Sequence, residues 1–498
     1  PGRTDDERAV RALRLLEAAR AVLLSQTLHT RSDLTDLRAR HPVLAARFIE
    51  LRDLLDQPTD EPAPTQMTGS PADSALTGDR ADPGAHDRHH LAERFDTLLR
   101  HIRSLDGFES FALPPTTEQL VEQARSGPVV VFNISRHRSD ALLLTGEGVT
   151  SLAMPALDHQ VVTARVRAFH QALRTAADGD AALPDRIAAQ ATLKEVLRWL
   201  WDAAAEPVLS ALGYDRTPAE GRPWPRVWWA PGGLLGQLPI HAAGHHDDPP
   251  GPGRRTVLDR VVSSYTPTVG ALRHARQRGT APPAPQRGLI VAMATTPGLP
   301  EGGRLPNVED EVALFQAHFP DLVLLAEPKD GQPADSGRVP TLGNVLQHLA
   351  DCTIAHFACH GVSDPIDPSL SRLLLHDHRD APLTVTALAP VVLDKARLAY
   401  LSACSTAVNT DTRLQDEAIH LASAFQLAGF PHVIGTLWPI NDAVAVTIAD
   451  TFYTTLTVGD GVVDTEKAAS ALHRAIRAAR DAYPRTPSLW AAYIHVGA

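Results

Sequence analysis

Short apolar runs alternate with longer segments of helical spacing throughout the second half of the chain. The apolar runs lie at residues 288–294, 322–325, 353–358, 397–403, 432–437 and 493–496. Between them, apolar residues recur at the spacing of one helix face at 307–318, 341–350, 416–428, 441–456 and 466–480. Parallel strands need crossover helices, and such sheets are covered on both faces. The alternation therefore predicts an α/β fold with a mainly parallel sheet flanked by helices.

The first half of the chain is predicted to be richer in helices. Helical spacing is found at 5–56, 91–126, 160–178 and 186–212, and strands are predicted at 128–133, 141–145 and 226–231. The first two of these strands predict a β-hairpin, and 257–267 indicates a further strand pair or a strand edge. Residues 57–90 are polar and rich in proline. Such a stretch buries too little apolar surface to offset its ordering entropy, so we expect a disordered linker there.

Composition and charge disfavour several classes of function. The 498 residues carry a formal net charge of −11, which disfavours nucleic acid as a partner, and no apolar run is long enough to span a membrane. The first residues lack the basic and then apolar order of a secretory signal. Three cysteines cannot form a disulfide framework, so the cytoplasm is the expected location. Only four of the 47 basic residues are lysines, a bias associated with GC-rich bacterial genomes.

Two of the predicted strands end in residues that can carry out chemistry. His360 and Gly361 follow the strand at 353–358, and Cys404 follows the strand at 397–403. Ligands gather at the carboxyl ends of parallel strands, so His360 and Cys404 face each other if the two strands are neighbours. A histidine supplies the base that turns a thiol into a thiolate nucleophile, and it can then protonate a leaving amine. The backbone N–H groups of Gly361 and Cys404 would form an oxyanion hole.

Other polar residues near these strands fit structural roles better. His356 lies within its strand and is expected to be a hydrogen-bonded core histidine, while Cys359 should face away from His360 as a buried thiol. Cys352, Cys359 and His360 do not have the spacing of zinc ligands, so we expect no metal and no cofactor. The run H-H-D-D at 245–248 is interpreted as a solvated turn, and no G-x-S-x-G motif supports a serine hydrolase.

The residues around these strand ends resemble a known family. The motifs are I-A-H-F-A-C-H-G at 354–361, L-S-A-C-S-T at 401–406, L-P-N-V-E-D-E-V at 305–312, the stretch 414–442 and S-L-W-A-A-Y-I-H-V-G at 488–497. Together they resemble the CHAT domain, a caspase- and separase-related cysteine peptidase domain. The resemblance covers roughly residues 140–498, because W-W-A-P-G-G-L-L-G-Q-L-P is similar to the N-terminal half of that domain.

The resemblance implies a caspase-type fold in which His360 and Cys404 form the catalytic dyad. It divides the chain into a helical segment at 1–56 that resembles the end of a tetratricopeptide array, the linker at 57–90, an inactive N-terminal half at 91–280 and a catalytic half at 281–498. One position departs from the family: Ser405 follows the cysteine, where the usual pattern has an acidic residue.

The function implied by the resemblance is that of a bacterial cysteine endopeptidase acting on a protein substrate in stress, antiphage defence or cell death. The alternatives are an inactive scaffold that acts by protein–protein interaction and a small-molecule hydrolase or amidase. The polar segments at 363–372 and 408–415 follow the dyad residues directly. We expect at least one of them to be disordered until an activating protein or ligand reorders it. The linker, which contains Arg80 and Arg88, is a candidate for self-cleavage.

Asp442 is the candidate residue for substrate specificity. It follows the strand at 432–437, which is expected to neighbour the Cys404 strand, and Trp438 and Pro439 beside it would exclude water. A carboxylate in this position can bind an arginine guanidinium through two hydrogen bonds. The resemblance to the separase branch, with its W-x-x-x-D segment, carries the S1 role onto Asp442 and implies cleavage after Arg or Lys. The alternative is that Asn441 or Asp442 caps the following helix.

Overall fold

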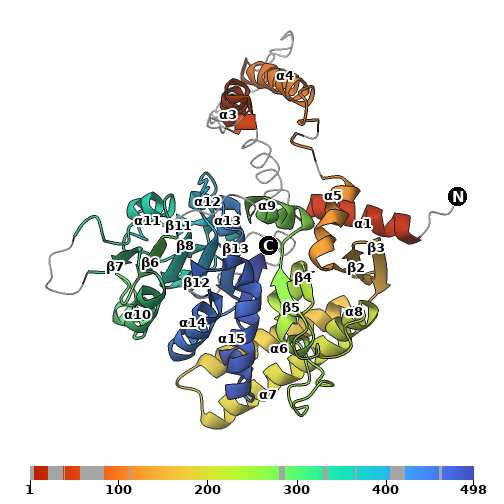
Figure 1. Cartoon of the computed structure of the whole chain (residues 1–498), viewed down its shortest axis with the longest axis vertical. Coiled ribbons are helices and arrows are strands. Elements are labelled where there is room, and N and C mark those ends of the chain that lie inside the picture. Colours follow the sequence, from red (N-terminus) through yellow and green to blue (C-terminus); the bar gives the residue numbers. More distant parts are fainter. Residues whose placement is uncertain are drawn as a thin grey trace, which may run out of the picture. The chain divides into compact units, whose positions relative to one another are not determined.

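The computed structural model describes residues 5–20, 37–38, 40–56, 83–109, 111–113, 115–279, 286–328, 335–364, 367–403, 421–458 and 462–498. The chain forms two compact units (Figure 1). The larger unit contains Pro1–Ser25 and Thr116–Ala498, and the smaller one contains Gln26–Pro115. The first helix, α1 (Asp5–Ala19), therefore belongs to the larger unit.

The smaller unit is built on helices α3 (Pro42–Asp56) and α4 (Pro83–Arg103). The ring of Phe48 lies 5.1 Å from that of Phe95 and 5.3 Å from that of Phe111, and Phe48 and Phe111 are buried. Helix α4 begins inside the stretch predicted as a linker, and residues 57–82 of that stretch lie outside the described part of the chain. This apolar cluster is small, as expected for a unit with two main helices.

The larger unit contains one sheet of 11 strands, in the order β3-β2-β1-β4-β5-β16-β13-β12-β8-β6-β7. Their bounds are β1 (Val129–Ile134), β2 (Ser139–Thr145), β3 (Gly148–Ala153), β4 (Arg226–Ala230), β5 (Val262–Tyr265), β6 (Gly288–Ala292), β7 (Leu322–Ala326), β8 (Ile354–Ala358), β12 (Leu398–Ser402), β13 (His432–Thr436) and β16 (Tyr493–Gly497). Three pairs are antiparallel, namely β1–β2, β2–β3 and β13–β16, and the other pairs are parallel. The predicted α/β fold with a mainly parallel sheet is confirmed.

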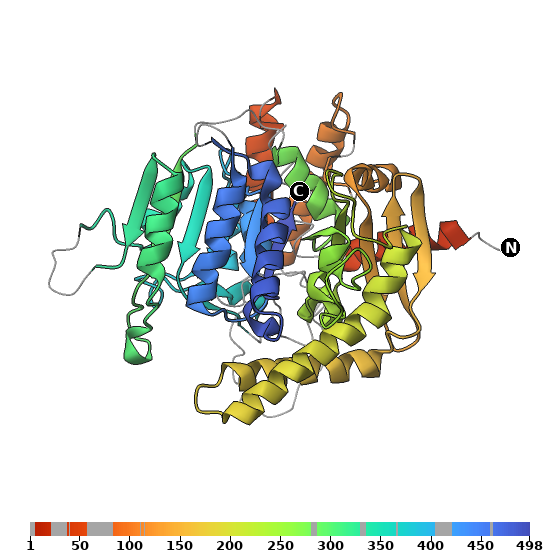
Figure 2. The same cartoon turned by 60° about the horizontal axis from the view of Figure 1, so that its bottom comes forward.

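Helices cover both faces of the C-terminal part of this sheet (Figures 1 and 2). One face carries α10 (Val308–His318), α14 (Asp442–Leu456) and α15 (Ala468–Ala482), and the other carries α11 (Leu342–Leu349), α12 (Val385–Leu388) and α13 (Leu421–Ala428). Helix α15 shows why these segments form amphipathic helices: Leu472, Ile476 and Ala479 recur on one buried stripe.

The N-terminal part of the sheet is covered by α5 (Thr117–Glu122), α6 (His159–Ala177), α7 (Leu183–Leu200), α8 (Glu206–Ala211) and α9 (Val269–Gly279). The hairpin predicted from the sequence is β1–β2. Residues 257–267 hold one strand, β5, rather than a pair, because Val257–Asp259 form a 3-10 turn capped by the side chain of Thr256. The predicted strand pair is therefore wrong.

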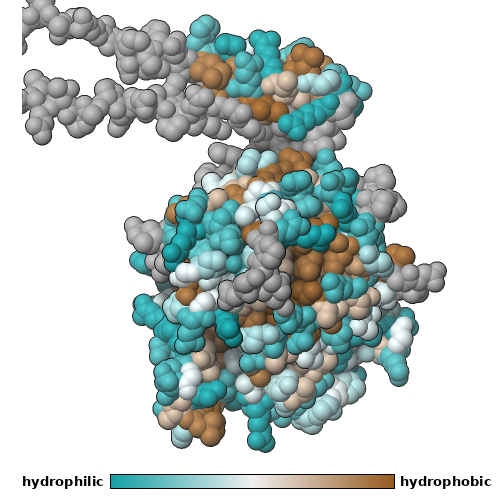
Figure 3. All heavy atoms as spheres, turned by 90° about the vertical axis from the view of Figure 1, so that its left-hand side faces the viewer, coloured by the Kyte–Doolittle hydropathy of each residue, from teal (hydrophilic) through white to brown (hydrophobic). Residues whose placement is uncertain are grey.

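The two parts of the sheet join where β16 pairs with β5. The indole of Trp228 on β4 donates a hydrogen bond to the Gly497 carbonyl at 2.8 Å, and Arg226 donates to the carbonyl of Ala498 at 2.6 Å. At the far end, β7 is the edge strand, and most of its side chains are only partly buried. Figure 3 views the molecule from this side, where apolar residues gather among hydrophilic ones.

Candidate active site

The carboxyl ends of β8, β12 and β13 lie side by side. Strand β12 pairs with β8 in parallel, with Ser402 opposite Ala358, and its other neighbour is β13. The sequence predicted that β13 neighbours β12, whereas it left the pairing of β8 with β12 as a condition, which this register fulfils. Because the three strands run in the same direction, the residues that follow them open onto one edge of the sheet.

His360 follows β8 and is held by a backbone carbonyl. Its Nε2 lies 3.1 Å from the carbonyl oxygen of Gly303, in the turn between β6 and α10. Since a carbonyl only accepts hydrogen bonds, Nε2 carries the proton, and in the neutral ring Nδ1 has the lone pair. The backbone of His360 is fixed as well, because its carbonyl accepts a 2.8 Å hydrogen bond from the N–H of Leu374.

A narrow pocket lies beside His360 and contains two carboxyl groups. Glu311 of α10 and Asp442 of α14 line it together with His360 and Ser402. The remaining lining residues are Leu305, Val308, Ala358, Cys359, Ile440 and Ala445, of which all but Cys359 are aliphatic. The pocket is therefore mostly aliphatic with a few converging polar groups, and its cavity volume is only about 20 Å³.

Glu311 is buried at the base of this pocket and has two partners. One carboxylate oxygen lies 2.6 Å from Nε2 of His356, and the other accepts a 3.2 Å hydrogen bond from the hydroxyl of Ser402. The second ring nitrogen of His356 lies 3.0 Å from the hydroxyl of Tyr453. His356 is fully buried and bonded through both nitrogens, so it is a core histidine, as predicted.

Asp442 is the first residue of α14, but it does not cap this helix. The cap is Asn441, whose side-chain oxygen accepts from the N–H of Val444 at 3.3 Å. The carboxyl of Asp442 therefore does not bind the backbone of the helix and instead lines the pocket. Burial raises the pKa of Asp442, and the negative charge of Glu311 raises it further. The charge of His360 lowers this pKa by a smaller amount.

Trp438 does not shield Asp442 in the way that the sequence suggested. Its buried indole donates to the Ser488 carbonyl at 3.0 Å and packs edge-on against Phe169 of α6, with ring centroids 5.4 Å apart. Pro439 is exposed. The apolar walls beside Asp442 come instead from Ile440 and Ala445.

Several predicted residues lie outside the described part of the chain. These are Cys404, Ser405, the segment 408–415 and residues 365–366 of the segment 363–372. Gly361 is described and begins β9 (Gly361–Val362), a short strand that pairs with β10 (Arg372–Leu373). Cys359 is buried, as predicted, and burial raises the pKa of Cys352 to about 12. Among the described residues, no cluster of His, Cys, Asp or Glu has the arrangement of a metal site.

The run at 245–248 forms a turn, as predicted, and Asp247 is exposed there, but the other three side chains are partly or fully buried. His245 lies 2.8 Å from Asp202, Asp247 pairs with Lys194, and Asp248 binds Arg255 through two hydrogen bonds of 2.8 and 3.0 Å. His246 is buried, and its Nε2 lies 2.7 Å from the carbonyl of Ala242. Each of the four side chains therefore has a protein partner, which composition alone does not reveal.

Two groups at this site were missed by the sequence analysis. The first, the Gly303 carbonyl, has no side-chain signal, because any residue in the turn supplies a carbonyl. The second is Glu311, which lies between Val308 and Phe315 on the buried stripe of α10. A carboxylate on an apolar stripe is unusual, so the position of Glu311 was the sequence feature that could have identified it as a site residue.

Comparisons with known proteins show the family and the fold of this chain. The family model of the CHAT domain matches residues 194–498. The solved structure of the separase–securin complex of Saccharomyces cerevisiae matches with a TM-score of 0.51 and 10% identity, over 82% of this chain and 33% of that one. Among curated proteins, none matches. The chain thus spans about a third of the separase chain, and the similarity shows a caspase-like fold.

Structures of Porphyromonas gingivalis RgpB are similar to a smaller part of the chain. The complex of its pro- and mature domains has a TM-score of 0.38 and 11% identity, over 59% of this chain and 69% of that one. The Arg-specific cysteine proteinase gingipain R (RGPB) has the same score and identity, over 59% and 68%. Of the helices described here, none has both the length and the hydropathy to cross a bilayer.

Proposed function

Because this chain belongs to the CHAT domain family, we propose that it is a cysteine endopeptidase with a dyad of Cys404 and His360. The register between β8 and β12 carries the proposal. Ala358 lies opposite Ser402, and His360 and Cys404 each come two positions later in the sequence. Two residues that leave neighbouring parallel strands at the same level can come within reach of each other.

The proposed mechanism assigns each proton to a named atom. Nδ1 of His360 accepts the thiol proton of Cys404, and the Gly303 carbonyl stabilises the resulting imidazolium through Nε2–H. The thiolate attacks the scissile carbonyl, and the N–H groups of Gly361 and Cys404 stabilise the oxyanion. The intermediate collapses when Nδ1–H protonates the leaving amine. Water, deprotonated by His360, then hydrolyses the acyl-enzyme and releases the thiol.

Cleavage after arginine, and less efficiently after lysine, is proposed from the charge of the pocket. Asp442 faces the pocket beside His360, and Glu311 adds a second carboxylate behind it. An arginine side chain offers a planar fork to a carboxylate, whereas lysine offers a point charge.

The domain roles and the biological setting belong to the same proposal. Residues 281–498 are proposed as the catalytic half and 91–280 as an inactive half. The segments 1–56 and 57–90 proposed as a tetratricopeptide remnant and a linker do not coincide with the compact units, because α1 belongs to the larger unit and α4 begins at Pro83. A protein partner or ligand would activate the enzyme in the cytoplasm of a bacterium, in a defence or cell-death pathway. The separase structure is itself a complex with a protein, securin. That precedent supports regulation by a protein partner.

An arginyl acyloxymethylketone, which alkylates reactive thiols, tests the dyad in the full chain. We expect the wild type to be labelled at Cys404, and Cys404→Ala and His360→Ala to remain unlabelled while they keep the wild-type melting temperature. Cys352→Ala is the matched control, since this thiol is buried and held in its neutral form, and it should be labelled like the wild type. If the wild type is labelled no more than Cys404→Ala, the peptidase proposal is wrong and the inactive scaffold replaces it.

A further inference from the structure

A second cavity, of about 980 Å³, shares no lining residue with the pocket of Asp442. It lies between the loop that follows α8, the loop at 246–254 and the C-terminal end of α15. Its charged lining includes Arg254, Arg477, Arg480, Asp259 and Asp481. Nothing in the proposed peptidase mechanism uses these groups.

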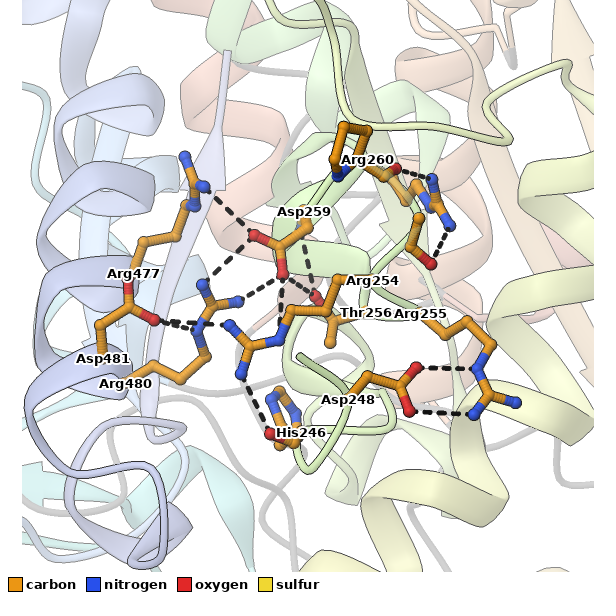
Figure 4. Close-up of polar contacts among 12 residues, drawn as sticks. His246, Asp248, Arg254, Arg255, Thr256, Asp259, Arg260, Arg477, Arg480 and Asp481 are labelled. Carbon is orange, nitrogen blue, oxygen red and sulfur yellow. Dashed lines mark hydrogen bonds and ion pairs between the residues drawn. The ribbon is translucent and has the colours of Figure 1, made fainter. Parts of the chain in front are cut away.

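Three guanidinium groups of this cavity share one buried carboxylate, that of Asp259. Arg480 binds both of its oxygens, at 2.8 and 3.2 Å, and Arg477 lies 3.1 Å from it. The guanidinium of Arg254 is 3.8 Å from the same carboxylate. Figure 4 shows these three arginines converging on Asp259 from the helix and from the loop. The buried part of the cluster therefore holds more positive than negative charge.

The carboxylates around the cavity do not balance this charge. Asp481 reaches Arg480 at 2.9 Å and Arg254 at 3.6 Å, but its side chain is largely exposed, so solvent screens it. Asp247 and Asp248 are paired with Lys194 and Arg255, outside the cluster. Glu220 at the rim is exposed. A small anion that enters the cavity would meet unbalanced guanidinium charge.

The titration behaviour of the neighbouring groups agrees with a positive local potential. Burial alone would raise the pKa of Asp259, yet the hydrogen bond and the charge of Arg480 hold it below its usual value. Burial lowers the pKa of His246 to about 4, and the charges of Arg480 and Arg254 act in the same direction. Both lowered pKa values mean that Asp259 stays negative and His246 stays neutral in the cavity, as a positive local potential requires.

Some donors that line the cavity are buried without a hydrogen-bond partner among the described residues. They are Nε of Arg254, Nε of Arg477 and the hydroxyl of Thr217. Arg254 is only 8% exposed, so bulk water does not satisfy its Nε. Buried donors normally have partners, and several unpaired ones in a single cavity indicate a missing acceptor.

We propose that this cavity binds a small molecule that carries phosphate or carboxylate groups. Both forked N–H groups of Arg480 are taken by Asp259, so the donors offered to the ligand are those of Arg254 and Arg477, whose Nε atoms lack a partner. The volume lies at the upper end of the range for small-molecule sites, so a ligand the size of a nucleoside diphosphate fits. Such a ligand would bridge the loop at 246–254 and helix α15, which come from the two halves of the sheet. This site does not depend on peptidase activity.

Calorimetric titration of the full chain at constant ionic strength tests the proposal, with pyrophosphate, adenosine diphosphate and citrate as probes. We expect at least one probe to bind the wild type. Arg477→Gln and Arg254→Gln each remove a charged donor, so we expect both to weaken binding by about tenfold or more. Arg477 is only partly buried, so its variant keeps the test valid if Arg254→Gln does not fold.

Arg165→Gln is the control, because Arg165 pairs with Glu195 and neither residue lines the cavity. Its affinity should equal that of the wild type. Preference for pyrophosphate or adenosine diphosphate over citrate identifies a phosphate ligand, and the reverse order identifies a carboxylate. The proposal is overturned if none of the three probes binds, or if Arg477→Gln binds as tightly as Arg165→Gln.

Discussion

Glu311 and Asp442 bring two carboxyl groups from different helices into one pocket. Glu311 is tied to His356 and Ser402, whereas Asp442 faces the pocket at the start of α14. Burial, and after it the negative charge of Glu311, raises the pKa of Asp442, so its carboxyl holds its proton to a higher pH than a solvated aspartate does.

The raised pKa of Asp442 predicts that the pH profile of kcat/KM for arginine substrates has an acidic limb. As pH falls through that pKa, Asp442 loses the charge that attracts the guanidinium, so kcat/KM should fall. Glu311→Gln removes a negative neighbour and should move the limb to lower pH. Asp442→Asn should lose about 2–4 kcal/mol of transition-state binding at neutral pH.

The measurement is a pH profile of kcat/KM with a peptide that has arginine at P1. Asp450→Asn, which removes an exposed carboxylate from the same helix, is the control and should leave the profile unchanged. A limb that stays in place in Glu311→Gln would contradict the assigned coupling.

Buried histidines predict a loss of stability in mild acid. Burial lowers the pKa of His241 and His473 to about 3 and that of His246 to about 4. In the unfolded chain these groups titrate near their usual value, so below it the unfolded state binds more protons and stability falls as pH decreases. At pH 5 each histidine should cost about 2 kcal/mol. Urea unfolding between pH 7 and pH 5 measures this, and His473→Gln should show a shallower dependence on pH.

Adding a single methyl group at Gly497, at the end of β16, should strongly lower the free energy of unfolding. The φ of Gly497 is +124°, and an added Cβ would lie 2.0 Å from the carbonyl oxygen of Pro431. Gly148 has a similar φ of +141°, but no atom of the described residues lies within 4 Å of its added Cβ. Gly148→Ala should therefore cost about 1 kcal/mol from backbone strain alone, and Gly497→Ala should cost several kcal/mol. Equal free energies of unfolding for the two variants would rule out the steric contribution.

The contacts of Arg20, which follows α1, indicate that the residues around α1 stabilise the larger unit. The buried guanidinium of Arg20 donates to the carbonyl of Ala230, the last residue of β4, at 3.1 Å and to the carbonyl of Phe132 within β1. Arg20→Ala leaves both carbonyls without these donors and should cost about 1–3 kcal/mol. Arg14→Ala removes an exposed hydrogen bond to Thr117 and should change stability by less than about 0.5 kcal/mol. Thermal unfolding of both variants, compared with the wild type, measures the difference.

The sequence by itself determined which segments are strands and helices in the second half of the chain. Apolar periodicity depends on each residue's own preference for burial, which is local, so the predicted strand at 353–358 became β8 and the segment at 441–456 became α14. It also placed His360 and Asp442 at strand ends, because the order of strand and helix implies the edge of the sheet.

Only the tertiary structure decided which buried groups meet. The Gly303 carbonyl at His360, the carboxylate of Glu311 beside Asp442 and the three arginines around Asp259 join segments that are distant in the chain. The partners of the turn at 245–248 were not predicted for the same reason, since they lie on α7, in the 201–205 segment and in a nearby loop. A sequence pattern reports that a side chain is buried, but its partner depends on strand order and helix packing, which bring together residues that no local periodicity relates.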